Sequence, residues 1–159
     1  MNTVTLEHQL TREELLDKTD DPSNKDLFNV DGGSDRIRYL HWGDARGEIH
    51  FVASINRRVV GIGAVRVNPF DDSVLWVKFV SVEAALQGNG IGKLISEAIF
   101  NYAQSERKRL HVASFSPMGK QRLLPLFHRL AVEHPELFCG CSDCGVQIAQ
   151  RQEGTYKNE

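Results

Sequence analysis

The chain has 159 residues, and its 41% of hydrophobic and 25% of charged residues are typical of one globular domain with its own core. A formal net charge of −2 excludes a general electrostatic attraction to nucleic acid or to an anionic membrane surface. The sequence contains no apolar run near the roughly 20 residues that a membrane-spanning helix needs. Its first residues also lack the pattern of a secretory signal, so we expect a cytoplasmic protein.

The N-terminal third predicts a short strand, a capped helix and a long polar loop. Val4–Leu6 is strand-like, and Thr11 and Glu14 have the spacing of a capping box, in which each side chain bonds to the other's backbone N–H. Residues 19–35 are rich in Asp, Asn, Pro, Ser and Gly, the composition of a loop. A short helix is expected at about residues 36–42.

The middle of the chain predicts an antiparallel meander. His50–Ile55 and Val59–Val67 are strand-like, and residues 56–58 between them suit a tight hairpin. A second turn is expected at residues 69–72, followed by a strongly β-prone run at Leu75–Val82.

The C-terminal half predicts two helices with short strands between and after them. From Ile91 on, apolar residues recur with helical spacing over about 16 residues. A short buried strand is expected at His111–Ser114 and a last strand at Val146–Gln150. The second helix either begins just before Pro125 or is kinked there, since proline is tolerated only in a first turn, and Pro135 ends it. The predicted fold class is therefore α/β with a mixed, α+β type of sheet, mostly antiparallel and flanked by helices.

Three glycines connect the last strand of the meander to the first of these helices, in the stretch LQGNGIGKLI at residues 86–95. Their G-x-G-x-G spacing differs from that of a dinucleotide-binding loop, and Gln87 stands where a Walker A loop needs its first glycine. The N–H groups and the positive dipole at a helix N-terminus bind phosphate, and glycine lets the ligand approach closely. The alternative is that these glycines only shape a turn.

The run from Gln87 to Gly92 matches the pattern [QR]-x-x-G-x-[GA] between a strand and an amphipathic helix. This pattern resembles the pyrophosphate loop of the GNAT superfamily of acyl-CoA-dependent N-acyltransferases. The likeness extends to the element order and to the region around Phe127, and covers about residues 36–139 of a single GNAT-like domain spanning 1–159.

The resemblance implies that acetyl-CoA or CoA is the co-substrate and that main-chain atoms hold its pyrophosphate. It also implies that the strand at 79–82 bends away from its neighbour and pairs with the pantetheine arm. The implied cofactor-binding residues are Phe79, Val80, Ser81, Val82, Gln87, Gly88, Asn89, Gly90, Ile91, Gly92, Lys93 and Phe127.

Acyl transfer to an amine requires a base, because an amine with a pKa of about 10.4 is protonated at neutral pH. Glu83 is our first candidate, since it follows the strand end directly; a solvated loop carboxylate is the alternative interpretation. His50 and His111 are further candidates, each of which is alternatively a packed residue of the sheet.

The family usually places a tyrosine as general acid where this chain has Phe127, which cannot donate a proton. Either the thiolate leaves without a protein acid, or a water or Ser116 protonates it. This departure also keeps open a non-catalytic acyl-CoA-binding or regulatory module of the same fold.

The three cysteines lie close together as C-x-C-x-x-C at Cys139, Cys141 and Cys144. We expect reduced thiols and no metal here. The alternatives are a reversible local disulfide and a zinc cluster with His134 as fourth ligand, which would suit a small metal-stabilised interaction domain.

The function that the resemblance implies is transfer of an acetyl group from acetyl-CoA to a primary amine. A small-molecule acceptor is favoured because nothing in the sequence indicates a large basic or peptide-docking surface. We expect neither nucleic acid nor membrane as a partner, and a homodimer is common among the proteins that this chain resembles.

Overall fold

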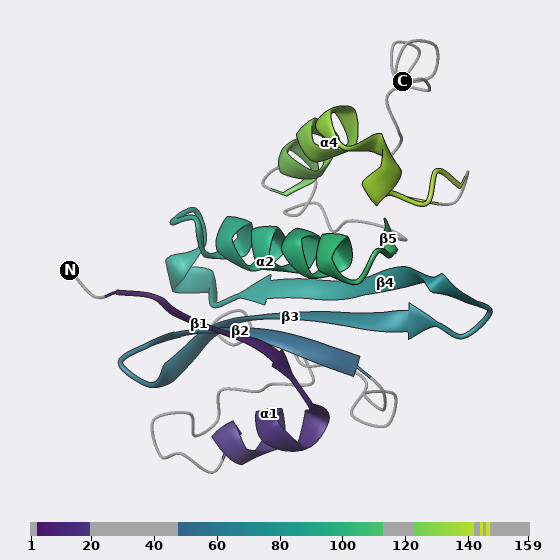
Figure 1. The fold of residues 1–159 in the computed structure, drawn as a ribbon. Helices are drawn as coiled ribbons and strands as arrows, with labels where there is room; N and C mark the ends of the chain where they lie inside the picture. Colours follow the sequence, from purple (N-terminus) through teal and green to yellow (C-terminus); the bar gives the residue numbers. More distant parts are fainter. Residues whose placement is uncertain (1–2, 20–47, 113–122, 142–143, 145, 147–159) are drawn as a thin grey trace. The chain divides into compact units, whose positions relative to one another are not determined.

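The computed structural model describes residues 3–19, 48–112, 123–141, 144 and 146 (Figure 1). Its strands, in chain order, are β1 (Thr5–Leu10), β2 (Glu48–Ile55), β3 (Arg58–Asn68), β4 (Asp71–Val82) and β5 (Arg109–His111). Its helices are α1 (Arg12–Thr19), α2 (Ile91–Ser105) and α4 (Leu124–Glu133), with the 3-10 turns η3 (Ala84–Leu86) and η4 (Pro135–Leu137).

The five strands form one mixed sheet in the order β1-β2-β3-β4-β5. β1 pairs with β2 and β2 with β3 in antiparallel fashion, whereas β4 and β5 are parallel. The predicted fold class and the antiparallel start of the sheet are therefore confirmed.

The chain divides into two compact units, whose boundary passes through the β3–β4 hairpin and through α2. Unit 1 comprises Met1–Arg66 and Lys78–Ile99, and unit 2 comprises Val67–Val77 and Phe100–Glu159. Each unit is described by itself below, and the single domain expected over residues 1–159 stays a prediction.

The β2–β3 hairpin of unit 1 is closed by Asn56 and Arg57, which have φ angles of 52° and 69°. Two successive residues in the left-handed region make the turn type that matches the natural twist of paired strands. The hairpin predicted at residues 56–58 is thereby confirmed. The turn pairs Ile55 with Arg58, and a shift of register between Ala53 and Ser54 then places Val52 opposite Ile62.

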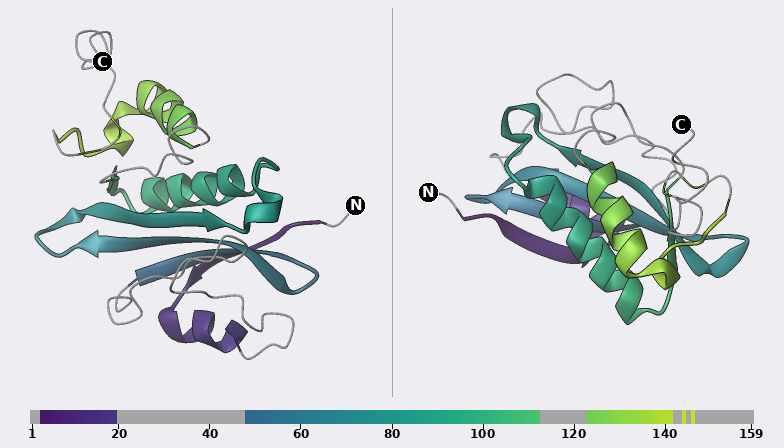
Figure 2. Two further views of the ribbon diagram at one scale, coloured as in Figure 1. Left: turned by 180° about the vertical axis from the view of Figure 1, so that it is seen from behind. Right: turned by 90° about the horizontal axis from the view of Figure 1, so that it is seen from above.

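The sheet of unit 1 carries a helix on each face (Figures 1 and 2). On one face, Leu15 of α1 packs in a buried cluster with Val52 and Ile62. On the other face, Gly63 lets α2 lie directly against the strand, since a Cβ there would be only 2.5 Å from Cγ2 of Ile95. The capping box that begins α1 is present as predicted, with the Glu14 N–H donating to the Thr11 hydroxyl at 3.2 Å.

In unit 2, α4 begins at Leu124 with Pro125 in its first turn. This confirms the first of the two predicted arrangements, because a proline there removes no helical hydrogen bond. The ring of Phe127, 1% exposed, packs edge-on against Phe100 with their centroids 5.0 Å apart.

Several strand boundaries differ from the prediction. β1 is Thr5–Leu10 rather than Val4–Leu6, and β2 and β3 differ from the predicted bounds by one or two residues. The two differences that follow concern β4 and β5. β4 begins at Asp71 rather than at Leu75, and β5 spans Arg109–His111 and so begins before the predicted start at His111, while residues 113–114 lie outside the described residues. The register explains the second difference, because β5 pairs with Val74–Trp76 and its position follows from that pairing rather than from its own composition. The helix predicted at 36–42 and the strand predicted at Val146–Gln150 lie outside the described residues, apart from Val146, which is buried. Among the described helices, none combines the length and apolarity needed to cross a bilayer.

Candidate functional site

The glycine loop lies between β4 and α2, with the short turn η3 at its start. Gly88 and Gly90 have φ angles of 87° and 84°, a conformation that L-residues with a side chain rarely adopt. The glycines are therefore required by the backbone of the loop itself, as the simple turn interpretation also expects.

The N-terminus of α2 is open and carries no anionic side chain. The first helical hydrogen bond runs from the Leu94 N–H to the Gly90 carbonyl at 3.0 Å. The N–H groups of Ile91, Gly92 and Lys93 precede it and have no place in the helical ladder. The first turn contains no acidic residue, and a Cβ built at Gly90 would have no atom of the described residues beyond its chain neighbours within 4 Å. This end of the helix is therefore suited to an anion.

The polar side chains of the loop are used to hold its shape. The Gln87 side-chain amide donates to the Val82 carbonyl at 3.0 Å, and that of Asn89 donates to the Leu86 carbonyl at 2.9 Å. Both residues are in the predicted cofactor-binding set, but these bonds engage their side chains, and the Gln87 N–H also donates to the Ala84 carbonyl at 3.3 Å.

Glu83, the predicted base, is 7% exposed and forms an ion pair with Arg58. Arg58 Nη1 donates to one carboxylate oxygen at 2.6 Å and Nη2 donates to the other. The hydrogen bond to Glu83 raises the pKa of Arg58. The sequence analysis missed Arg58, since its partner lies 25 residues away and no local spacing connects them.

The predicted pantetheine-binding strand, residues 79–82, is the end of β4. On its β3 side, a Cβ at Gly61 would be 3.5 Å from the Ser81 carbonyl oxygen, and the Glu83 N–H donates to the Val60 carbonyl at 2.9 Å. The described pairing between β4 and β5 covers only Val74–Trp76 of β4. Residues 113–122 lie outside the described residues, so the predicted bend of the strand stays a prediction.

The structure also bears on His50, a further candidate base, on Phe127, which stands at the expected acid position, and on Ser116, the candidate acid. His50 is fully buried, with Nδ1 3.2 Å from the Leu10 carbonyl oxygen and Nε2 3.5 Å from Glu48. Phe127, expected at the tyrosine position, belongs to the aromatic core of unit 2. Ser116 lies outside the described residues.

The three cysteines lie together in unit 2 without a disulfide between them, and a histidine joins them. It is His111, whose Nδ1 lies 3.3 Å from Sγ of both Cys139 and Cys141. His134, the ligand proposed from the sequence, instead has its Nδ1 3.6 Å from Glu136 and is not in the metal-ligand group found among the described residues. The sequence analysis named His111 as a candidate base but did not place it with the cysteines, because it is 28 residues before Cys139.

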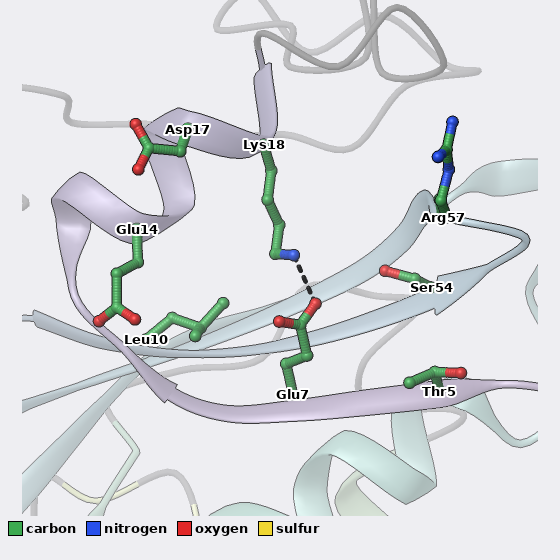
Figure 3. Close-up of a pocket in the computed structure, with 8 residues that line it drawn as sticks. All are labelled: Thr5, Glu7, Leu10, Glu14, Asp17, Lys18, Ser54 and Arg57. Atoms are coloured by element: carbon green, nitrogen blue, oxygen red, sulfur yellow. Dashed lines mark hydrogen bonds and ion pairs between the residues drawn. The ribbon is translucent and has the colours of Figure 1, made fainter.

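A pocket of about 560 Å³ opens beside α1 and β1 in unit 1 (Figure 3). Its size suits a small ligand, but three of its charged side chains make contacts within the protein. Lys18 reaches across to pair with Glu7, as Figure 3 shows, and Glu14 accepts hydrogen bonds from Thr11. We assign no function to this pocket.

The mixed five-stranded sheet flanked by helices defines an α/β protein, and its glycine loop leads into the N-terminus of α2. The sequence model of the "Acetyltransferase (GNAT) family" matches residues 12–123. The chain therefore belongs to the GNAT acetyltransferase family, as the glycine pattern indicated. A comparison with curated proteins found no match.

Several solved structures share the fold. An IAA acetyltransferase from Bacillus cereus ATCC 14579 is 19% identical with a TM-score of 0.53, over 80% of this chain and 75% of that one. An acetyltransferase from Trypanosoma brucei is 17% identical with a TM-score of 0.52, over 80% and 91%. The aminoglycoside acetyltransferase meta-AAC0020, from an uncultured soil metagenomic sample, is 16% identical with a TM-score of 0.52, over 76% and 82%. At these identities the similarities establish the fold.

Proposed function

We propose that this protein transfers an acetyl group from acetyl-CoA to a primary amine of a small molecule. The observation that carries the proposal is the open N-terminus of α2, where Gly90 leaves space free among the described residues and the first helical turn has no acidic side chain. Membership of an acetyltransferase family supports acetyl-CoA as the ligand whose pyrophosphate fills this space.

In this proposal the chain's own backbone binds the cofactor. The N–H groups of Ile91, Gly92 and Lys93 donate to the pyrophosphate. The negative charge of the pyrophosphate is stabilised by the positive end of the helix dipole. The edge of β4 at residues 79–82 pairs with the amides of the pantetheine arm and directs the thioester toward the amine.

The chemical step forms a C–N bond and breaks the C–S bond. The neutral amine attacks the thioester carbonyl, the tetrahedral intermediate expels the CoA thiolate, and the proton lost by the amine passes to a base. Glu83 stays the proposed base on account of its place at the end of β4. Each of its oxygens accepts one hydrogen bond from Arg58, and since a carboxylate offers about four lone-pair sites, a remaining one can accept the proton of the amine.

Calorimetry with acetyl-CoA tests the binding step on three variants. Gly90→Glu puts a negative charge where the pyrophosphate is proposed, and we expect its affinity to fall by more than about 100-fold. Gly90→Gln has the same size and the same backbone strain at a φ of 84°, so the difference between the two variants reports the charge of the ligand. Gln104→Glu adds the same charge at an exposed position of α2 and should leave the affinity unchanged. Equal affinities for Gly90→Glu and wild type would show that the loop is only a turn.

Release of free CoA thiol in the presence of an amine panel then tests catalysis. The panel contains polyamines, amino sugars, amino acids and an aminoglycoside, with hydrolysis in the absence of amine as the blank. Amine-dependent thiol release supports the proposed transfer. The buried position of Phe127, which leaves no phenol at the expected acid position, favours the second candidate, a non-catalytic acyl-CoA-binding module. Tight binding without thiol release for every amine would establish that candidate instead.

A further inference from the structure

His111, Cys139 and Cys141 bring three soft metal-ligand atoms together in unit 2. The Nδ1 of His111 is 3.3 Å from each sulfur, and the two sulfurs are 3.4 Å apart. In a tetrahedral zinc site, bond lengths of about 2.3 Å to sulfur and about 2.0 Å to nitrogen place the ligand atoms roughly 3.5–3.8 Å apart. The three ligand atoms therefore need to move apart only slightly to bind one shared Zn²⁺ ion.

Backbone contacts at the end of β5 create this convergence. The Cys139 N–H donates to the Leu110 carbonyl at 2.9 Å, which holds the segment after η4 beside β5. Gly140 has a φ of 73°, so the chain turns between the two cysteines and both sulfurs face the same imidazole. A side chain at position 140 would resist this conformation.

Cys144 lies beside these three, but the group of ligand atoms within 4.8 Å of one another contains only His111, Cys139 and Cys141, so its sulfur has to move closer to share the ion. Its N–H donates to the Cys141 carbonyl at 3.3 Å, and it is only 3% exposed. Its thiol shares a hydrogen bond with that of Cys139. The Val112 N–H donates to its sulfur at 3.5 Å, the kind of outer contact that stabilises a thiolate ligand.

We propose a structural Zn²⁺ site with one imidazole and three thiolate ligands: His111, Cys139, Cys141 and Cys144. Three thiolates and one imidazole make a closed, soft ligand set that prefers zinc and leaves no open position for catalysis. On binding, the thiol protons pass to solvent and the ion fastens the segment after η4 to β5. The proposal is independent of acetyl transfer, because it uses no residue of the glycine loop.

Metal analysis of the full-length protein, purified without chelator and kept reduced, tests the proposal directly. We expect one zinc per chain, and Co²⁺ replacement should give the visible bands of a tetrahedral site with thiolate ligands. Removing the metal should lower the thermal unfolding temperature, since binding free energy is folding free energy at such a site. The glycine-loop variant Gly90→Glu should retain its zinc, which separates this site from the proposed function.

Single substitutions of the proposed ligands test which side chains bind the zinc. Cys141→Ser changes an exposed thiol, so the protein should fold, and its zinc affinity should fall by more than about 100-fold. His111→Asn should lose affinity and change the Co²⁺ spectrum, whereas the matched control His134→Ala should behave as wild type. The same affinity and spectrum in His111→Asn as in wild type would remove histidine from the ligand set.

Two results would overturn the site as a whole. One is less than about a tenth of a zinc per chain after reconstitution of reduced protein with excess Zn²⁺. The other is a freshly isolated protein in which alkylation and mass spectrometry find two of the three thiols joined as a disulfide and no metal. The latter would establish the local disulfide as the native state of this cluster.

Discussion

Arg58 holds both carboxylate oxygens of Glu83 in unit 1, so the residue after β4 has a structural partner as well as a proposed catalytic role. We predict that Glu83→Gln lowers the free energy of unfolding by about 1–2 kcal/mol, because a charge-assisted pair is lost while the partly exposed Arg58 is still solvated. Urea denaturation measures this change.

The corresponding change in Arg58 separates the two roles of Glu83. Arg58→Met should destabilise the fold to a similar extent and yet leave Glu83 available as a base. If Glu83 is the base, Glu83→Gln abolishes the pH-dependent rise of kcat/KM, and Arg58→Met preserves that rise. Loss of activity in both variants in proportion to their loss of folding would instead leave the pair with a structural role only.

Glu14, in the capping box at the start of α1, contributes to the stability of the fold in a pH-dependent way. Hydrogen bonds from the backbone and the side chain of Thr11 hold the pKa of Glu14 below its ordinary value of 4.5. A lowered pKa in the folded state means that this stabilisation is present above the unfolded value and is lost as the pH falls through the folded value. An NMR titration should find the lowered pKa, Thr11→Ala should recover part of the shift toward 4.5, and Thr11→Ser should preserve the shift. A pKa of 4.5 in wild type would contradict the capping box in solution.

At the scale of the element, the contact between β3 and α2 depends on the absence of a side chain at Gly63. A Cβ there would lie 2.5 Å from Cγ2 of Ile95 and 3.1 Å from Cδ1 of Ile99. We predict that Gly63→Ala destabilises the protein by about 1–3 kcal/mol, because Cγ2 is attached to the branched carbon of Ile95 and cannot turn aside without a rotamer change. Equilibrium unfolding in urea measures the effect.

Two comparisons test the cause of this destabilisation. At Gly61 the nearest atom, at 2.9 Å, is the terminal Cδ1 of Ile95, so Gly61→Ala should cost less than Gly63→Ala. Ile95→Ala removes Cγ2, and the double variant with Gly63→Ala should therefore lose less than the sum of the two single losses. Strictly additive losses would show that the strain at Gly63 has another origin.

At the scale of the whole molecule, the order of the elements and the family were readable from the sequence. The match to the GNAT acetyltransferase family over residues 12–123 agrees with the pattern from Gln87 to Gly92. The strand at Glu48–Ile55, the helix beginning at Ile91 and the start of α4 before Pro125 also agree with the prediction. Each of these features rests on periodicity or turn chemistry within a few residues, and this local information is complete in the sequence.

The tertiary structure alone decided which distant residues meet. It placed Arg58 on Glu83 across 25 residues, and it placed His111 rather than His134 with the cysteines that follow Phe138. It also fixed β5 at Arg109–His111, since a strand of three residues takes its position from its partner β4. Spacing along the chain determines helices, strands and turns, but side-chain partners are set by how strands register and helices pack, which brings together residues that share no local pattern.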